Sequence, residues 1–111
     1  MPVINKIAFD ELKQMSDEDF INELIDAFLE DAPNMINAMQ TALGTKDVES
    51  FRRNAHSMKS NANTFGATEL AALAKELEGM GKEANLDVGN RLEVLKEAFG
   101  QVADELKGMR A

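Results

Sequence analysis

The sequence predicts an all-α protein: an antiparallel up-down-up-down four-helix bundle with a short extra N-terminal helix. Its 111 residues are 44% hydrophobic and 29% charged and include only two prolines. Strong helix formers such as Ala, Leu, Glu and Lys are abundant, while the scarcity of Val and Ile and the absence of Tyr and Trp disfavour a sheet. Apolar residues recur at intervals of three and four in long segments joined by short links, which is typical of helical bundles.

The N-terminal half predicts a short helix followed by a long one. Residues 7–15 have an apolar pattern that ends at Ser16, whose hydroxyl is expected to cap the next helix. This second helix is expected to run to Gly44. Pro33 interrupts it, so we expect a kink, or a break in which Asp31 caps the following piece. Its apolar stripe consists of Ile21, Leu24, Ile25, Phe28, Leu29, Ala32, Met35, Ile36, Met39 and Leu43.

Three further helices are predicted after the turn at residues 44–46. The first of them is expected to have Asp47 as its N-cap and to end at Gly66, a residue free to adopt a left-handed conformation. Its core face consists of Val48, Phe51, Ala55, Met58, Ala62 and Phe65. The other two, on either side of a polar connection around Asn85, carry Leu70, Leu73, Leu77, Met80 and Ala84, and Val88, Leu92, Leu95, Phe99, Val102 and Leu106. We expect residues 1–111 to form a single domain.

Composition limits the possible sites and partners. The absence of cysteine excludes disulfides, thiolate metal sites and cysteine nucleophiles. A net charge of −8 disfavours binding to nucleic acid or to an anionic membrane surface, so the expected partners are proteins. No apolar run approaches the roughly 20 residues that span a bilayer, and no signal peptide is visible. We therefore expect a cytoplasmic protein. We also expect it to be a monomer.

The single histidine is the main candidate for chemistry. His56 points well over 90° away from the core face of its helix, so it is expected at the surface. Arg52, Arg53 and Lys59 form the densest cationic patch in this acidic protein, and Asn63 lies on the same outward stripe. Cations favour the neutral imidazole, whose lone pair can act as a nucleophile, and they stabilise an attached phosphoryl group. The alternative is an ordinary surface histidine.

Around His56 the sequence resembles the histidine-containing phosphotransfer (HPt) domain family of two-component phosphorelays. The family motif reads roughly Ala-His-x-Leu-Lys-Gly, five residues and then Gly, followed by a Leu-rich helix that ends in Leu-Glu. The matching residues are Ala55, His56, Lys59, Gly66, Ala67, Leu70, Leu77 and Glu78. Met58 replaces the usual leucine, a near-isosteric change, and Ser60 replaces the usual glycine. Ser60 is still small, as is Ser57, so the ring is expected to stay accessible, with less clearance beside it.

The resemblance implies a function in signal transduction. Nε2 of His56 would accept a phosphoryl group from a receiver-domain aspartyl phosphate and pass it to an aspartate on another receiver, with Lys59 stabilising the phosphate. The implied partners are response-regulator receiver domains and a hybrid sensor histidine kinase. The receiver would supply Mg²⁺, so the chain itself needs no cofactor and no metal. Because no ATP-binding motif occurs, we expect a phosphocarrier without ATP-dependent kinase activity.

A docking surface is also expected beside the histidine. Phe20 and Leu24 lie off the main stripe of the second helix, and Leu12 and Met15 of the first helix add to them. The resemblance places the receiver-binding patch here. The alternative is that these side chains pack the N-terminal helix onto the bundle.

Three other functional classes are weighed against phosphotransfer. A metal- or haem-binding bundle is disfavoured by a single outward histidine and no cysteine, and Glu76 and Glu78 are interpreted as solvated surface. The dimerisation domain of a histidine kinase is disfavoured because Ser57 follows His56 and no proline follows Pro33. A non-catalytic helical adaptor, a degenerate HPt-like domain that binds a receiver or other signalling protein, stays open, although both His56 and Lys59 are retained.

Overall fold

The computed structural model describes residues 4–110, and they fold into five α-helices without a strand in that range. The predicted all-α class is confirmed. The helices are α1 (Lys6–Met15), α2 (Glu18–Thr45), α3 (Val48–Thr64), α4 (Thr68–Lys82) and α5 (Arg91–Met109). None of the helices in residues 4–110 is both long and apolar enough to cross a membrane.

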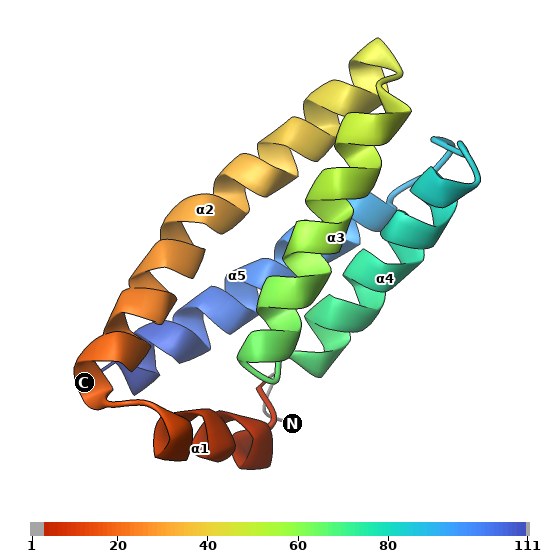
Figure 1. Cartoon of the computed structure of the whole chain (residues 1–111). Helices are drawn as coiled ribbons and strands as arrows, with labels where there is room; N and C mark the ends of the chain where they lie inside the picture. Colours follow the sequence, from red (N-terminus) through yellow and green to blue (C-terminus); the bar gives the residue numbers. More distant parts are fainter. Residues whose placement is uncertain (1–3, 111) are drawn as a thin grey trace.

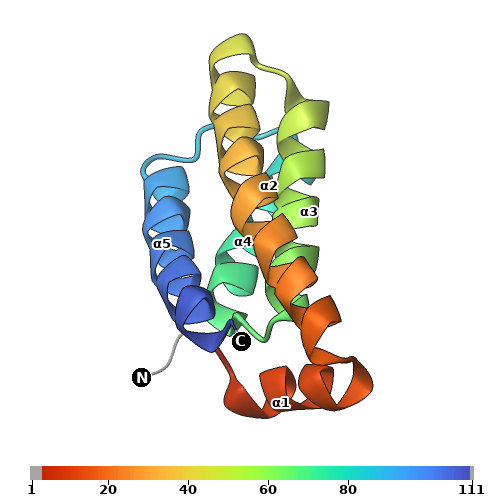
Figure 2. The same ribbon diagram turned by 90° about the vertical axis from the view of Figure 1, so that its left-hand side faces the viewer.

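The four long helices lie side by side, and α1 lies across one end of them (Figure 1). α3 packs against both α2 and α4, while α5 packs against α4 and α2. The same end position of α1 is visible after a quarter turn of the molecule (Figure 2). α3 therefore has a neighbouring helix on each side, and its third side faces outward.

Side-chain hydrogen bonds cap the N-termini of α1, α2 and α3. Asn5 caps α1 through its Oδ1, which accepts from the backbone N–H of Ile7 at 2.9 Å. α2 is capped by Asp17, whose carboxylate accepts from the Phe20 N–H at 2.8 Å. The prediction that Ser16 caps this helix is wrong, because Ser16 ends α1 in an extended conformation and the adjacent carboxylate takes the capping role. For α3, the predicted cap at Asp47 is confirmed.

α2 continues through Pro33 from Glu18 to Thr45. The predicted alternative of a break recapped by Asp31 is therefore wrong. A proline inside a helix costs about 3 kcal/mol or more. Here buried residues lie on both sides of the proline, among them Phe28, Ala32 and Ile36. Burying these side chains on one continuous face outweighs the lost backbone hydrogen bond.

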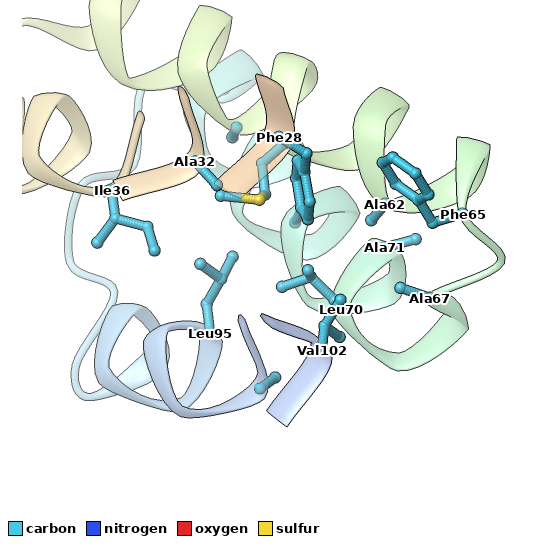
Figure 3. Close-up of a cluster of buried hydrophobic side chains, with 14 of the residues drawn as sticks. Phe28, Ala32, Ile36, Ala62, Phe65, Ala67, Leu70, Ala71, Leu95 and Val102 are labelled. Atoms are coloured by element: carbon cyan, nitrogen blue, oxygen red, sulfur yellow. The ribbon is translucent and has the colours of Figure 1, made fainter. Parts of the chain in front are cut away.

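The core lies between the long helices and uses most of the predicted stripes. Two positions differ from the prediction: Ala84 is exposed beyond the end of α4, and Val88 is buried but precedes α5. Phe28 is its aromatic centre, with ring centroids 5.4 Å from Phe65 and 5.6 Å from Phe99. Side chains from α2, α3, α4 and α5 converge around it (Figure 3). Met39, Met58 and several other long apolar side chains are fully buried. This packing fixes the rotation of each helix about its own axis and thus which residues of α3 face outward.

The N-terminal segment is tied to the turn between α3 and α4. Gly66 follows α3 with a left-handed φ of +74°, as predicted for the residue that ends this helix. Its carbonyl accepts a 2.7 Å hydrogen bond from the Asn5 N–H. A Cβ at position 66 would lie 2.8 Å from the Ala8 Cβ and 3.0 Å from the Asn5 carbonyl oxygen. The close approach of α1 to this turn therefore requires glycine.

Candidate functional site

His56 lies on α3 with its side chain 58% exposed. Its neighbours Ala55 and Met58 on the same helix are fully buried. The predicted outward direction is confirmed. The ring is thus presented to solvent from a helix whose opposite face is held in the core.

A buried carboxylate on the neighbouring helix α4 forms a hydrogen bond with the imidazole. Glu78 of α4 is 3% exposed and is the only buried charged residue among those described. One of its oxygens lies 2.6 Å from His56 Nδ1, and the other accepts from Lys59 Nζ at 2.5 Å. Because an ionised carboxylate only accepts hydrogen bonds, Nδ1 carries the proton. The neutral ring then has its lone pair on Nε2.

The carboxylate is charged because its partners outweigh its burial. The hydrogen bond from Lys59 contributes most to lowering the pKa of Glu78 below the ordinary value of 4.5, and the bond from His56 lowers it further. Burial acts in the opposite direction. Glu78 is therefore ionised at neutral pH, and its negative charge is paired with the ammonium group of Lys59.

A glycine lets α4 approach α3 closely enough for this contact. Gly81 lies one turn after Glu78 and is buried. A Cβ at position 81 would lie 3.1 Å from the Arg52 Cβ and 3.2 Å from its Cα. The absence of a side chain at Gly81 thus allows the backbones to pack here, and the carboxylate one turn away reaches the α3 side chains.

Two sequence interpretations of this region are corrected. Glu78 was expected on the solvated surface but is buried, whereas Glu76 is exposed and pairs with Arg91 at 2.7 Å. Cations were expected to be the charges that act on the ring, but a carboxylate bonds to it directly. Both differences have one cause: the rotation of α4 against α3 sets which of its carboxylates faces α3. Two sequence signals were available: Glu78 matches the Leu-Glu ending of the family motif, and Gly81 lies one turn beyond it.

Of the other predicted site residues, Lys59 is bonded to Glu78 and the rest lie outside this hydrogen-bonded group. Lys59 is 25% exposed and its ammonium group is bonded to Glu78, so it is more buried than its position on the outward stripe predicted. Arg52 is 33% exposed and pairs with Glu49 on its own helix. The remaining predicted residues make no contact with Glu78 among the hydrogen bonds described: Arg53, Ser60 and Asn63 are exposed, and Gly66 lies beyond the end of α3.

The predicted docking residues separate into two kinds. Met15 and Phe20 are 85% and 47% exposed, respectively. Leu12 and Leu24 are half-buried and pack against the core, as the packing alternative predicts. Ile7, which was not among the predicted docking residues, is 73% exposed. Among residues 4–110, the large exposed apolar side chains at this end of the molecule are therefore Ile7, Met15 and Phe20.

Residues 4–110 contain no group of three or more His, Cys, Asp or Glu side chains placed to hold a metal ion. The site combines a mostly exposed imidazole, a buried carboxylate that bonds to its Nδ1 and a lysine that neutralises the carboxylate.

The comparisons with known proteins agree with this arrangement. A family model described as Hpt domain matches residues 23–110. The fold is similar to that of histidine-containing phosphotransfer protein B (HptB) from Pseudomonas aeruginosa PAO1, with a TM-score of 0.87 and 24% identity over 98% of this chain and 95% of that chain. The comparison with curated proteins gave no match. Because the family model spans most of the chain, including α3 and α4, the protein belongs to the Hpt domain family and has a histidine phosphotransfer role in phosphorelay signalling.

Proposed function

We propose that His56 carries the phosphoryl group, accepting it from the aspartyl phosphate of one receiver domain and passing it to an aspartate of another. The contact between Glu78 and His56 Nδ1 is the observation that carries this proposal. It occupies one ring nitrogen, so Nε2 is left as the nucleophile on a side chain that is mostly exposed.

The transfer step follows from this tautomer. The lone pair of Nε2 attacks phosphorus, so an N–P bond forms as the bond between phosphorus and the aspartyl oxygen breaks. The electron pair of the broken bond leaves with the aspartate carboxylate. The proton on Nδ1 stays in place, and Glu78 holds the positive charge that develops on the ring. Transfer to the second receiver is the reverse of this step.

Lys59 has two roles in the proposal. Its hydrogen bond keeps Glu78 ionised in a buried position. An ammonium group has three N–H donors, so the phosphoryl group can also be contacted by a donor that Glu78 does not use.

The partners follow from the family and the chemistry. We propose that they are receiver domains of response regulators and of a hybrid sensor histidine kinase, and that the receiver brings the Mg²⁺ that transfer requires. The chain then acts as a phosphocarrier without ATP-dependent kinase activity. Exposed Ile7, Met15 and Phe20 support docking at the α1 end of the molecule.

The proposed scaffold is a monomeric single domain over residues 1–111 that works in the cytoplasm. We interpret α2 to α5 as an antiparallel up-down-up-down four-helix bundle, with α1 as the short extra helix. The short connections between α2 and α3 and between α3 and α4 support this interpretation.

The test uses a phosphorylated receiver domain as donor in the absence of ATP. The wild-type protein is expected to acquire an acid-labile, base-stable phosphoramidate, and the His56→Gln variant no label. A circular dichroism spectrum establishes that the variant is folded. Equal labelling of the variant would refute His56 as the acceptor. An unlabelled wild-type protein that still binds receivers would favour the adaptor alternative.

Replacing Lys59 by alanine is expected to slow transfer about tenfold and to cost about 1–3 kcal/mol of unfolding free energy, because the buried Glu78 carboxylate loses a charged partner. Lys75→Ala is the matched control, since Lys75 is an exposed lysine of α4 in the same groove as Lys59. Transfer rates and urea unfolding curves measure both effects. If both variants behave alike, the bond between Lys59 and Glu78 is not important.

A further inference from the structure

The charged groups bonded in the site do not fully neutralise a phosphoryl group on His56. The charges of Glu78 and Lys59 cancel each other. A phosphoryl group adds roughly two negative charges near neutral pH, and the protonated phosphoimidazole ring contributes one positive charge. One negative charge therefore remains after His56 is phosphorylated, and a further cation is needed close to Nε2.

Arg52 is placed to provide that cation. It lies four residues before His56, so the two side chains are neighbours on the surface of α3. Its stem is fixed against α4, since its Cα and Cβ face the backbone of Gly81. Its planar guanidinium can donate two parallel hydrogen bonds to phosphoryl oxygens, which an ammonium group cannot do.

In the resting protein the guanidinium of Arg52 is bound elsewhere. It donates to the Glu49 carboxylate, which lies three residues earlier on α3 and thus one turn further from His56. Glu49 is exposed, so this ion pair is accessible to water and weak enough to exchange. The charge of Arg52 also interacts with that of Glu78, which places the arginine within the electrostatic reach of the site.

We propose that Arg52 exchanges partners during the relay: Glu49 binds its guanidinium while His56 is free, and the phosphoryl group binds it once His56 is phosphorylated. This inference rests on the proposed function of His56. It assigns Glu49 as the competing anion that limits how strongly the protein retains its phosphoryl group.

The neighbouring arginine provides a matched control. Arg53 has the same charge and is exposed. It lies three residues before His56 and so is also a neighbour of the ring. It lies about 100° further around the helix than Arg52, so it flanks His56 on the side away from the α4 contact at Gly81. Effects of overall charge are shared by both arginines, whereas a specific contact with the phosphoryl group depends on Arg52.

The test phosphorylates the whole protein with phosphoramidate, a small-molecule donor, and follows the phosphoryl group by ³¹P NMR across a pH titration. A bound guanidinium favours the dianion and lowers the pKa of the phosphoryl group. Arg52→Gln is expected to raise this pKa by about half a unit to one unit, and Arg53→Gln by less than a third of that shift. Glu49→Gln is expected to lower it.

Two further measurements test whether Arg52 exchanges partners. In an Arg52→Gln background, Glu49→Gln is expected to have no effect, because Glu49 acts through Arg52. In the wild-type protein, phosphorylation is expected to move the Nε–H resonance of Arg52 more than that of Arg53. Equal shifts for the two arginines, or an unchanged Glu49→Gln effect without Arg52, would overturn the exchange. If phosphoramidate produces no phosphohistidine signal in the wild-type protein, the function proposed for His56 fails instead.

Discussion

Replacing Glu78 by alanine is expected to slow phosphotransfer about ten- to a hundredfold, with the helical fold retained. The variant removes the only described acceptor of His56 Nδ1 and the counter-ion of Lys59. The ring is then free to take the other tautomer, in which Nε2 carries the proton and is not a nucleophile. Transfer rates from a phosphorylated receiver measure the effect.

Glu78→Gln separates the two roles of the carboxylate. The amide oxygen still accepts a hydrogen bond from Nδ1 but carries no charge to neutralise Lys59. We therefore expect transfer rates between those of the wild type and the alanine variant. If the alanine variant transfers at the wild-type rate, orientation of the ring by Glu78 is unimportant.

The same carboxylate makes stability depend on pH. Its pKa in the folded protein is lowered from 4.5, so its ionised form stabilises the fold at pH values above 4.5. The contribution is lost as pH falls below this value through the folded-state pKa. In urea unfolding between about pH 6 and pH 3, the stability advantage of the wild type over Glu78→Gln is expected to decrease. A constant difference would contradict the assigned ionisation.

Replacing Gly66 by alanine is expected to cost about 2–5 kcal/mol of unfolding free energy. A φ of +74° is unfavourable for alanine by about 1–2 kcal/mol. The added Cβ also overlaps the Ala8 side chain and the Asn5 carbonyl oxygen, and overpacking typically costs about 1–3 kcal/mol. α1 must move away to relieve this contact, which weakens the hydrogen bond between Asn5 and the Gly66 carbonyl.

Gly100→Ala is the control for this prediction. Gly100 lies in α5, is exposed, and has no atom within 4 Å of an added Cβ. Alanine there is expected to stabilise the protein by about 0.5–1 kcal/mol, because it loses less conformational entropy than glycine when the helix forms. Urea unfolding measures both variants. A Gly66→Ala variant as stable as the wild type would show that α1 does not depend on this contact.

Sequence periodicity was sufficient for the features that depend on one helix at a time. The stripe that contains Phe51 and Met58 predicted which side of α3 is buried, and the direction of His56 followed from its angle to that stripe. The cap at Asp47 and the end of α3 at Gly66 were also predicted, since they depend on residues within one turn. The prediction of Ser16 in place of Asp17 as the cap of α2 was wrong, because both residue types can accept the same backbone hydrogen bond.

The interactions that orient the imidazole and keep Glu78 ionised could be identified only from the tertiary structure. His56 and Glu78 are 22 residues apart in sequence and lie on different helices. Whether a given carboxylate of α4 meets α3 is set by the rotation and longitudinal register of the two helices. These follow from core packing and from the close approach at Gly81. The sequence by itself therefore determined the helical class and the outward direction of His56, whereas only helix packing decided that the buried, ionised Glu78 contacts its ring.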